Sequence, residues 1–421
     1  MLRFGSLILI SIVFTKTGLS TAEIGHYEIF MLISGLLSAF WVTGLIQSFL
    51  PLFEKNKTFS RNNPGKSPEL FNAFLVLTAF SILTLMILLV LKRPIESIFN
   101  QSSEIKYFDL LLVYIFLNSP SFLTEYIYLL KNKPVSMLIY GFSSFLIQFL
   151  LVSSAAVLGL GMFYCITGLV IVTTMRYIWL VFLLKKYARP AFSPVFIGEH
   201  LRFGYPLIVS SLLGSSAQYI DGFMVMSNYD PATFAIFQYG AREFPLVLLM
   251  ANAFSTAMIP EFSEAGNLNN ALARLKQKTG RLMHFLFPCT LVLMVFSDWL
   301  YPIVFNENFM ESAGIFNIYL LLIISRLVFP HTILIGLKKT GAVMWASVIE
   351  LTVNLSFSFV FMLLWGIKGV ALGTLVAYGV QKSVWIIYVA GRLKIRPAKY
   401  IPVRMLSVYS VILLIVFLLT L

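Results

Sequence analysis

Residues 70–91 read LFNAFLVLTAFSILTLMILLVL, with no charged side chain between Glu69 and Lys92. A run of about 20 apolar residues is long enough for a helix to cross the hydrocarbon core of a bilayer. The whole chain of 421 residues shares this character, because it is 59% hydrophobic and 12% charged, with a mean hydropathy of +0.87. A soluble domain carries roughly 25% charged residues. The sequence therefore predicts a membrane protein built mostly of spanning segments.

Thirteen such runs lie between polar breaks. All are predicted to be helices, because a helix satisfies its own backbone hydrogen bonds in lipid. The predicted spans are 2–20, 27–50, 70–91, 107–130, 135–157, 162–184, 204–226, 232–258, 281–303, 313–336, 343–365, 369–390 and 405–421.

Lysine and arginine predict the orientation. With the N-terminus in the cytoplasm, most of them fall in cytoplasmic segments, and the opposite side keeps only Lys16, Lys92, Arg93, Lys106 and Lys368. This bias satisfies the positive-inside rule. The net charge of +13 is thus a topology signal. No basic soluble domain exists to bind nucleic acid, so anionic membrane lipids are the partners expected for these loops.

A weak internal repeat relates residues 27–54 to residues 234–264. The first segment begins with YEIF and the second with FAIF. Near their ends the two segments carry PLF and PEF. The repeat predicts two parallel six-helix lobes, 1–190 and 198–390, followed by a basic linker and an extra hydrophobic segment, 391–421. Parallel repeats commonly enclose a central site. The first span looks shortened, so either the natural start lies upstream or this half is naturally short.

Charged residues interrupt the run SSAQYIDGFMVMSNYDPATFAIFQYGAREF, residues 215–244. A charge inside the membrane costs about 2.5–3.5 kcal/mol on insertion scales, so it normally faces a wet cavity or a partner. Asp221 either reaches the outer surface or faces a cavity. Arg242 and Glu243 are neighbours and would point about 100° apart on a helix. One is therefore expected to line a cavity and the other to pair with another helix, and an Asp221–Arg242 pair is our hypothesis.

Other deep charges extend the candidate site. Arg326, near the middle of its span, is the best single candidate for a cavity cation. Lys382 and Arg176 lie in the inner halves of their spans, where they either line the path or extend to the surface. Glu350 suits a partner cation or a proton. The polar residues that could bond a hydroxyl-rich cargo, or simply join helices, are Gln148, Gln218, Tyr219, Gln238, Asn252, Asn354 and Gln381.

Four prolines within predicted spans mark expected kinks, because proline removes a backbone donor. They are Pro120, Pro206, Pro245 and Pro330. No GxxxxGK[ST] loop and no HExxH motif occurs, and the four histidines are scattered, so neither a metal site nor a cofactor is predicted.

The sequence resembles the Wzx-type flippases, the polysaccharide-export branch of the MATE-like multidrug/oligosaccharidyl-lipid/polysaccharide superfamily. The matching pieces, in order, are AEIGHYEIF (22–30), TGL (43–45), YPLIVSSLLGSSAQYID (205–221), Tyr239, Pro260 and GIKGVALGTLVAYG (366–379). Family members often carry arginine after the aspartate of the seventh helix, where this chain has Gly222. The fold class expected is all-α, a polytopic membrane protein with 12–14 transmembrane helices in two six-helix lobes and a short C-terminal helix.

The resemblance implies that the protein moves an undecaprenyl-diphosphate-linked oligosaccharide across the bacterial inner membrane for surface polysaccharide assembly, alongside polysaccharide assembly enzymes. The path candidates are Arg326, Arg242, Lys382 and Arg176. The candidates for pairing, or for coupling to a proton or sodium gradient, are Glu350, Glu243 and Asp221. Three alternatives stay open: a drug or cation antiporter of the same superfamily, a peptidoglycan-precursor flippase, and a membrane polymerase or ligase. A polymerase or ligase needs a sizeable outer loop, whereas the longest one predicted here is 92–106. The flippase interpretation makes the protein a transporter and not an enzyme.

Overall fold

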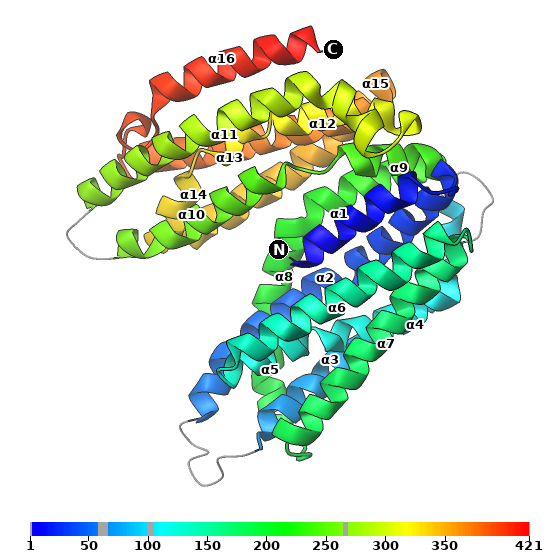
Figure 1. Ribbon diagram of the computed structural model, residues 1–421. Helices are drawn as coiled ribbons and strands as arrows, with labels where there is room; N and C mark the ends of the chain where they lie inside the picture. The colour runs from blue at the N-terminus through cyan, green and yellow to red at the C-terminus, as the bar shows by residue number, and fades with distance from the viewer. Residues whose placement is uncertain (1, 58–65, 99–104, 264–267, 421) are drawn as a thin grey trace. The chain divides into compact units, whose positions relative to one another are not determined.

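The structure is a computed structural model that describes residues 2–57, 66–98, 105–263 and 268–420 (Figure 1). Within these residues the chain is helical, with one isolated bridge between Ser67 and Ala188. The first seven helices are α1 (Leu2–Thr15), α2 (Thr21–Lys57), α3 (Pro68–Ile98), α4 (Phe108–Ser121), α5 (Leu123–Leu130), α6 (Pro134–Val157) and α7 (Met162–Tyr187). Next come α8 (Pro194–Asn228), α9 (Pro231–Gly240), α10 (Pro245–Ser263) and α11 (Leu268–Val304). The last are α12 (Met310–Leu320), α13 (Ile323–Arg326), α14 (Pro330–Gly336), α15 (Thr340–Gly391) and α16 (Val403–Leu419), with short 3₁₀ turns at Glu307–Phe309 and Pro397–Lys399.

The predicted all-α membrane fold is confirmed. Each of the thirteen predicted spans overlaps helix in the described residues, although some of them are interrupted. Over the same residues, nine helices are long and apolar enough to cross a membrane, and α1 and α16 contribute shorter apolar helices. The protein is therefore a multi-pass membrane protein.

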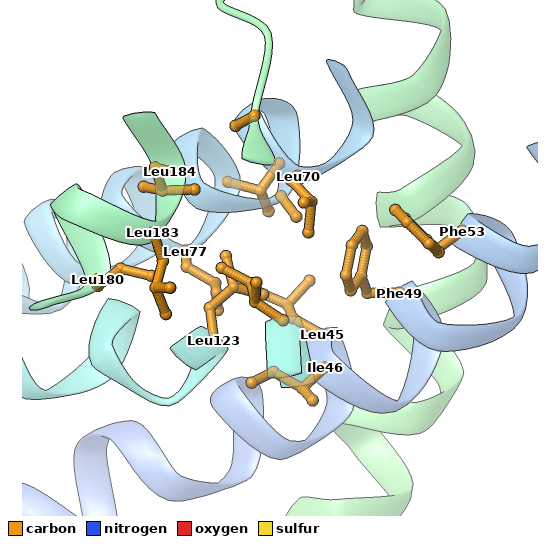
Figure 2. Close-up of a cluster of buried hydrophobic side chains, with 14 of the residues drawn as sticks. Leu45, Ile46, Phe49, Phe53, Leu70, Leu77, Leu123, Leu180, Leu183 and Leu184 are labelled. Carbon is orange, nitrogen blue, oxygen red and sulfur yellow. The ribbon is translucent and has the colours of Figure 1, made fainter. Parts of the chain in front are cut away.

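The chain forms two compact units. Unit 1 comprises residues 1–215 and 226–235, and unit 2 comprises residues 216–225 and 236–421. In unit 1, α6 packs against both α1 and α7, and α4 packs against α3 and α7. Its core gathers side chains from α2, α3, α5, α6, α7 and α8, and Figure 2 shows part of it. The members labelled there are Leu45, Ile46, Phe49, Phe53, Leu70, Leu77, Leu123, Leu180, Leu183 and Leu184.

In unit 2 the long helix α15 contains two of the predicted spans, folded back on each other. Trp365 and Gly366 have non-helical backbone angles, and Gly366 has φ 60°, a conformation that glycine adopts without strain. Ser358 donates a hydrogen bond to the Val370 carbonyl at 3.2 Å, across the hairpin. A Cβ atom at Gly373 would collide with the backbone of Ser358, so glycine is what lets the two halves approach.

The span predicted over 232–258 is not one helix. It breaks between Gly240, where α9 ends, and Pro245, where α10 begins, and residues 241–244 are not helical. Proline explains the break, because it lacks a backbone donor and disfavours helical geometry in the preceding residue. Gly240 is buried at this end of α9, where an added Cβ atom would lie 2.6 Å from the Ser312 carbonyl oxygen.

The span predicted over 313–336 is also broken. It consists of α12, the single turn α13, and α14, which starts at Pro330. Proline at the first turn of a helix needs no donor, so Pro330 begins a helix here rather than bending one. Pro120 lies one residue before the end of α4. Pro206, in contrast, lies inside α8, which continues through it.

Candidate functional site

The two helix breaks of unit 2 are joined by an ion pair. Arg326, the last residue of α13, donates from Nε to Glu243 Oε2 at 2.9 Å and from Nη2 to Glu243 Oε1 at 2.5 Å. The Arg326 side chain is 18% exposed and the Glu243 side chain 8% exposed. Two parallel bonds between a guanidinium and a carboxylate are among the strongest polar contacts in proteins. Arg326, the best single candidate for a cavity cation in the sequence analysis, is thus paired with a carboxylate. Its side chain remains partly exposed.

Tyr378 of α15 completes the setting of Arg326. Its hydroxyl accepts a hydrogen bond from Arg326 Nη2 at 3.1 Å, and its ring lies 4.5 Å from the guanidinium carbon. An aromatic face stabilises a cation placed over it. Three groups therefore fix the plane of this guanidinium.

Side chains donate hydrogen bonds to backbone carbonyls next to the two breaks. Lys382 Nζ, buried on α15, donates to the Val328 carbonyl at 3.1 Å. The Tyr301 hydroxyl donates to the Tyr239 carbonyl near the end of α9 at 3.0 Å. Carbonyls at a helix end need such partners when water is scarce. Lys382 therefore has a structural contact at the same break that presents Arg326.

Glu350 and Lys382 lie on the two opposite halves of the α15 hairpin. Its carboxylate accepts a hydrogen bond from Gln381, the residue before Lys382, and both Glu350 and Gln381 are buried. The α15 hairpin thus brings the Glu350 carboxylate next to the Gln381 amide, and the Lys382 ammonium belongs to the following residue. His331, on α14, bonds the Ser255 hydroxyl through Nε2 at 2.9 Å.

Asp221 lies in a second polar cluster of unit 2. It is 2% exposed. Its carboxylate accepts hydrogen bonds from the Tyr319 hydroxyl at 3.1 Å, from Asn354 Nδ2 at 3.2 Å and from the Thr374 hydroxyl. The Oδ1 atom of Asn354 is buried and has no hydrogen-bond partner among the described residues. The cluster thus gathers oxygen atoms from α8, α12 and both halves of α15.

The predicted Asp221–Arg242 pair is not among the ion pairs of the described residues. Arg242 instead lies over the ring of Tyr239, with its guanidinium carbon 4.7 Å from the ring centroid. The expectation assumed that residues 241–244 continue a helix. Because they do not, the 100° rule for helical neighbours does not apply to Arg242 and Glu243.

Arg176 is the one path candidate in unit 1. It donates from Nε to the Ser144 hydroxyl at 2.8 Å and from Nη2 to Gln148 Oε1 at 2.7 Å, and its guanidinium lies over Phe145. A cavity of about 20 Å³ beside it is lined by Glu125 among others. That space is about what one water molecule needs. Arg176 is thus built into a satisfied polar contact between α6 and α7.

The structure brings together Arg326, Glu243, Lys382 and Glu350 around the two breaks, and it places Asp221 in a separate cluster. Sequence reasoning missed the partners Tyr378, Tyr319 and Thr374. The segment GIKGVALGTLVAYG contains Tyr378 and Thr374, so the family resemblance pointed at the right helix without assigning them roles. The side chain of Gln218 lies outside the described residues.

Comparison with solved structures defines the class of the fold. The lipid II flippase MurJ, in its inward closed conformation, matches 99% of this chain and 90% of its own, with a TM-score of 0.71 and 18% identity. A multidrug resistance MATE family transporter of the MOP superfamily matches 97% of this chain and 95% of its own in its inward-facing conformation, with a TM-score of 0.66 and 13% identity. A multidrug resistance MATE family transporter of the MOP superfamily in an outward-facing conformation matches 93% of this chain and 93% of its own, with a TM-score of 0.61 and 13% identity. This chain therefore has the fold of MOP superfamily transporters.

The sequence identifies the family more narrowly. A family model described as polysaccharide biosynthesis protein matches residues 19–314, which is well over half of the chain. The chain belongs to this polysaccharide biosynthesis family, which confirms the family predicted from its motifs. No curated protein sequence matches the chain.

Proposed function

We propose that the protein is a flippase that moves an undecaprenyl-diphosphate-linked oligosaccharide across the bacterial cytoplasmic membrane for surface polysaccharide assembly. Its family and its fold support transport rather than catalysis. In this proposal the N-terminus is cytoplasmic, as the distribution of Lys and Arg indicates. Polysaccharide assembly enzymes supply and consume the cargo.

The observation that carries the proposal is the forked contact between Arg326 and Glu243 at the two helix breaks. A guanidinium fork fits a phosphate as well as it fits a carboxylate. In this proposal the diphosphate of the cargo displaces the Glu243 carboxylate and binds the Arg326 guanidinium in its place. Glu243 keeps the empty site neutral, and the exchange replaces the water that the phosphates lose.

Flipping assays on reconstituted protein test this exchange. The assay follows a fluorescent prenyl-diphosphate saccharide in proteoliposomes, with a membrane-impermeant quencher reporting the outer leaflet. Arg326→Ala is expected to slow flipping by about 10- to 100-fold, since each charge-assisted hydrogen bond is worth about 1.5–3 kcal/mol. Arg326→Lys keeps the charge but loses the fork, so it is expected to fall between wild type and Arg326→Ala.

Two further variants make the assay decisive. Glu243→Gln removes the competing carboxylate, so inorganic pyrophosphate should inhibit this variant at lower concentration than wild type. Lys339→Ala, an exposed cation in a loop, is the matched control and should flip normally. Normal flipping by Arg326→Ala at equal protein levels would remove Arg326 from the path.

We further propose that Asp221 couples transport to an ion gradient. The cluster around it offers the Asp221 carboxylate, the unpartnered Asn354 Oδ1 and the Thr374 hydroxyl. An all-oxygen set of this kind suits a hard cation such as sodium. The carboxylate alone also accepts a proton. Sodium and proton are thus both compatible with this cluster, and Asn354 Oδ1 favours sodium, because a proton on Asp221 leaves that oxygen unused.

Imposed gradients distinguish the two ions. Flipping is measured in proteoliposomes with a sodium gradient, a proton gradient or neither. A response to sodium that Asn354→Ala abolishes supports sodium coupling, whereas a response to protons that survives in Asn354→Ala assigns a proton to Asp221. Equal rates under all three conditions overturn the coupling proposal and leave the flipping proposal standing.

The runner-up is a drug or cation antiporter of the same fold. The sequence argument against it was that the deep charges lean positive. Within unit 2 they balance in number, because it contains the three cations Arg242, Arg326 and Lys382 and the three carboxylates Asp221, Glu243 and Glu350. The family match therefore supports a saccharide cargo over a cationic drug. Export of a cationic dye that is lost in the Glu243→Gln variant, without any flipping of the saccharide, would instead support the antiporter.

A further inference from the structure

A groove with a volume of about 750 Å³ runs along the first half of α11 in unit 2. Its other wall is the segment from Ala398 to Met405, which contains the turn before α16 and the start of that helix. Figure 1 shows α16 running beside α11, and the two helices are in contact.

One face of α11 forms the long wall. Its lining residues recur every three or four positions from Asn269 to His284, which is the spacing of a single helix face. Leu272 and Gly280 are buried and form the floor, while Lys276 and Arg281 are exposed at the rim. The groove is therefore apolar below and cationic above.

Hydrogen bonds hold the two walls together at both ends. Lys276 Nζ donates to the Ala398 carbonyl at 2.7 Å, and Lys399 Nζ lies 3.4 Å from Asn269 Oδ1. At the other end His284 Nδ1 bonds the Tyr409 hydroxyl at 2.7 Å. The groove is thus a formed feature of unit 2 and not a gap between loosely packed helices.

The charge of the groove has one sign. Lys276, Arg281 and Lys399 line it, and none of the described residues that line it is acidic. Two other cations of this region, Arg274 and Lys278, lie outside the groove and pair with Glu261. Lys276, Arg281 and Lys399 are not part of any ion pair among the described residues, so the groove offers a net positive charge to a ligand.

The groove also lies where the chain changes from polar to apolar. After Arg281, α11 carries no further Lys or Arg, and α16 is apolar from Met405 onward. Cations followed by an apolar surface mark the level of the lipid headgroups. A ligand here has its charged part at the rim and its apolar part along α11 and α16.

We propose that this groove binds the headgroup phosphate of an anionic phospholipid, with its acyl chains lying against the outer faces of α11 and α16. Basic pockets between helices at a membrane surface bind anionic headgroups through such contacts. Lys276, Arg281 and Lys399 hold the phosphate, and the small residues Gly280 and Ala273 leave it room. The bound lipid fastens the C-terminal helix α16 to α11. This site is separate from the helix breaks around Arg326, and it does not depend on the proposed cargo.

The test measures binding of phosphatidylglycerol to the purified full chain by native mass spectrometry, with phosphatidylcholine as the uncharged reference. The triple variant Lys276→Gln, Arg281→Gln and Lys399→Gln is expected to bind phosphatidylglycerol about 10- to 100-fold more weakly, since each cation near a surface contributes to the attraction. The matched control is Lys338→Gln, Lys339→Gln and Lys394→Gln, which removes the same charge from positions outside the groove. It is expected to bind as wild type does.

Photocrosslinking gives a second readout that does not depend on the variants. A phosphatidylglycerol with a photoreactive headgroup should label peptides from 269–284 and 398–405. Wild-type affinity in the groove variant, equal losses in both triple variants, or labelling elsewhere would overturn the proposal. Displacement of the lipid by inorganic pyrophosphate at similar concentration would also overturn it, because the groove would then be a site for a soluble or cargo diphosphate.

Discussion

Breaking the Arg326–Glu243 pair from one side should destabilise unit 2 strongly, and removing both partners should cost much less than the two single changes together. The pair is buried, with side-chain exposures of 18% and 8%, so water screens it little. Removing one partner of such a pair costs about 3–5 kcal/mol, because the other charge is left without compensation. The double variant Glu243→Ala/Arg326→Ala leaves no orphan charge. We therefore expect a coupling energy of about 2–3 kcal/mol in the double-mutant cycle.

The assay is reversible unfolding of the purified protein in mixed micelles, with the free energy of unfolding measured for wild type, both single variants and the double variant. The control cycle uses Lys278 and Glu261, which lie 3.3 Å apart with side-chain exposures of 48% and 25%. An exposed pair of this kind should give a coupling of about 0.2–1 kcal/mol. If the Arg326–Glu243 cycle gives no more than the control, the two helix breaks are not joined by this pair, and the exchange with a diphosphate loses its basis.

Three further outcomes follow from the packing around the breaks and the caps. Gly240→Ala should destabilise the fold by about 1–3 kcal/mol through overpacking, whereas Gly379→Ala, which meets no atom within 4 Å, should be neutral or stabilising; thermal unfolding of the two variants compares them directly. Tyr301→Phe should cost about 0.5–1.5 kcal/mol, because it removes the hydroxyl that donates to the Tyr239 carbonyl, and a Tyr301→Phe variant as stable as wild type would contradict this contribution. Burial raises the pKa of Asp230, but hydrogen bonds from the Thr233 hydroxyl and from backbone N–H groups at the start of α9 outweigh burial and lower it. The stabilisation from this cap is therefore present above the ordinary aspartate pKa and is lost as the pH falls below it, so Asp230→Ala should cost about 1 kcal/mol at neutral pH and progressively less in acid.

The apolar runs predicted the helices well, because lipid imposes one requirement on every spanning segment. A span of about 20 apolar residues must satisfy its own backbone, so run length alone located the helices. The breaks were harder to predict. Pro245 and Pro330 lie within spans just as Pro206 does, yet α8 continues through Pro206. A proline can start a helix or bend one, and sequence does not show which backbone groups the neighbouring helices can bond.

The charged site candidates of the predicted spans are buried or partly buried in the structure, but their partners were not predicted. Glu243 and Arg326 are 83 residues apart in the chain, and periodicity carries no information about contacts at that separation. The expected Asp221–Arg242 pair is not among the ion pairs of the described residues, and Arg242 lies in the non-helical segment between α9 and α10. Asp221 was found as a buried carboxylate, whereas its donors Tyr319, Asn354 and Thr374 come from helices that only the fold brings together.

The positions of the deep charges have a common physical cause. A helix break in lipid exposes backbone groups that must be bonded, and polar side chains are the available partners. Lys382 bonds the carbonyl of Val328 at one break, and Glu243 itself belongs to the other. Once polar groups are gathered there, a charge is less costly at the break than anywhere along an intact helix. An ion pair that joins two breaks is also easier to open than one between rigid helices, because the backbone on each side is not fixed by a continuous hydrogen-bond ladder. The breaks thus supply both the polar environment that Arg326 requires and the freedom to exchange Glu243 for the phosphates of a cargo.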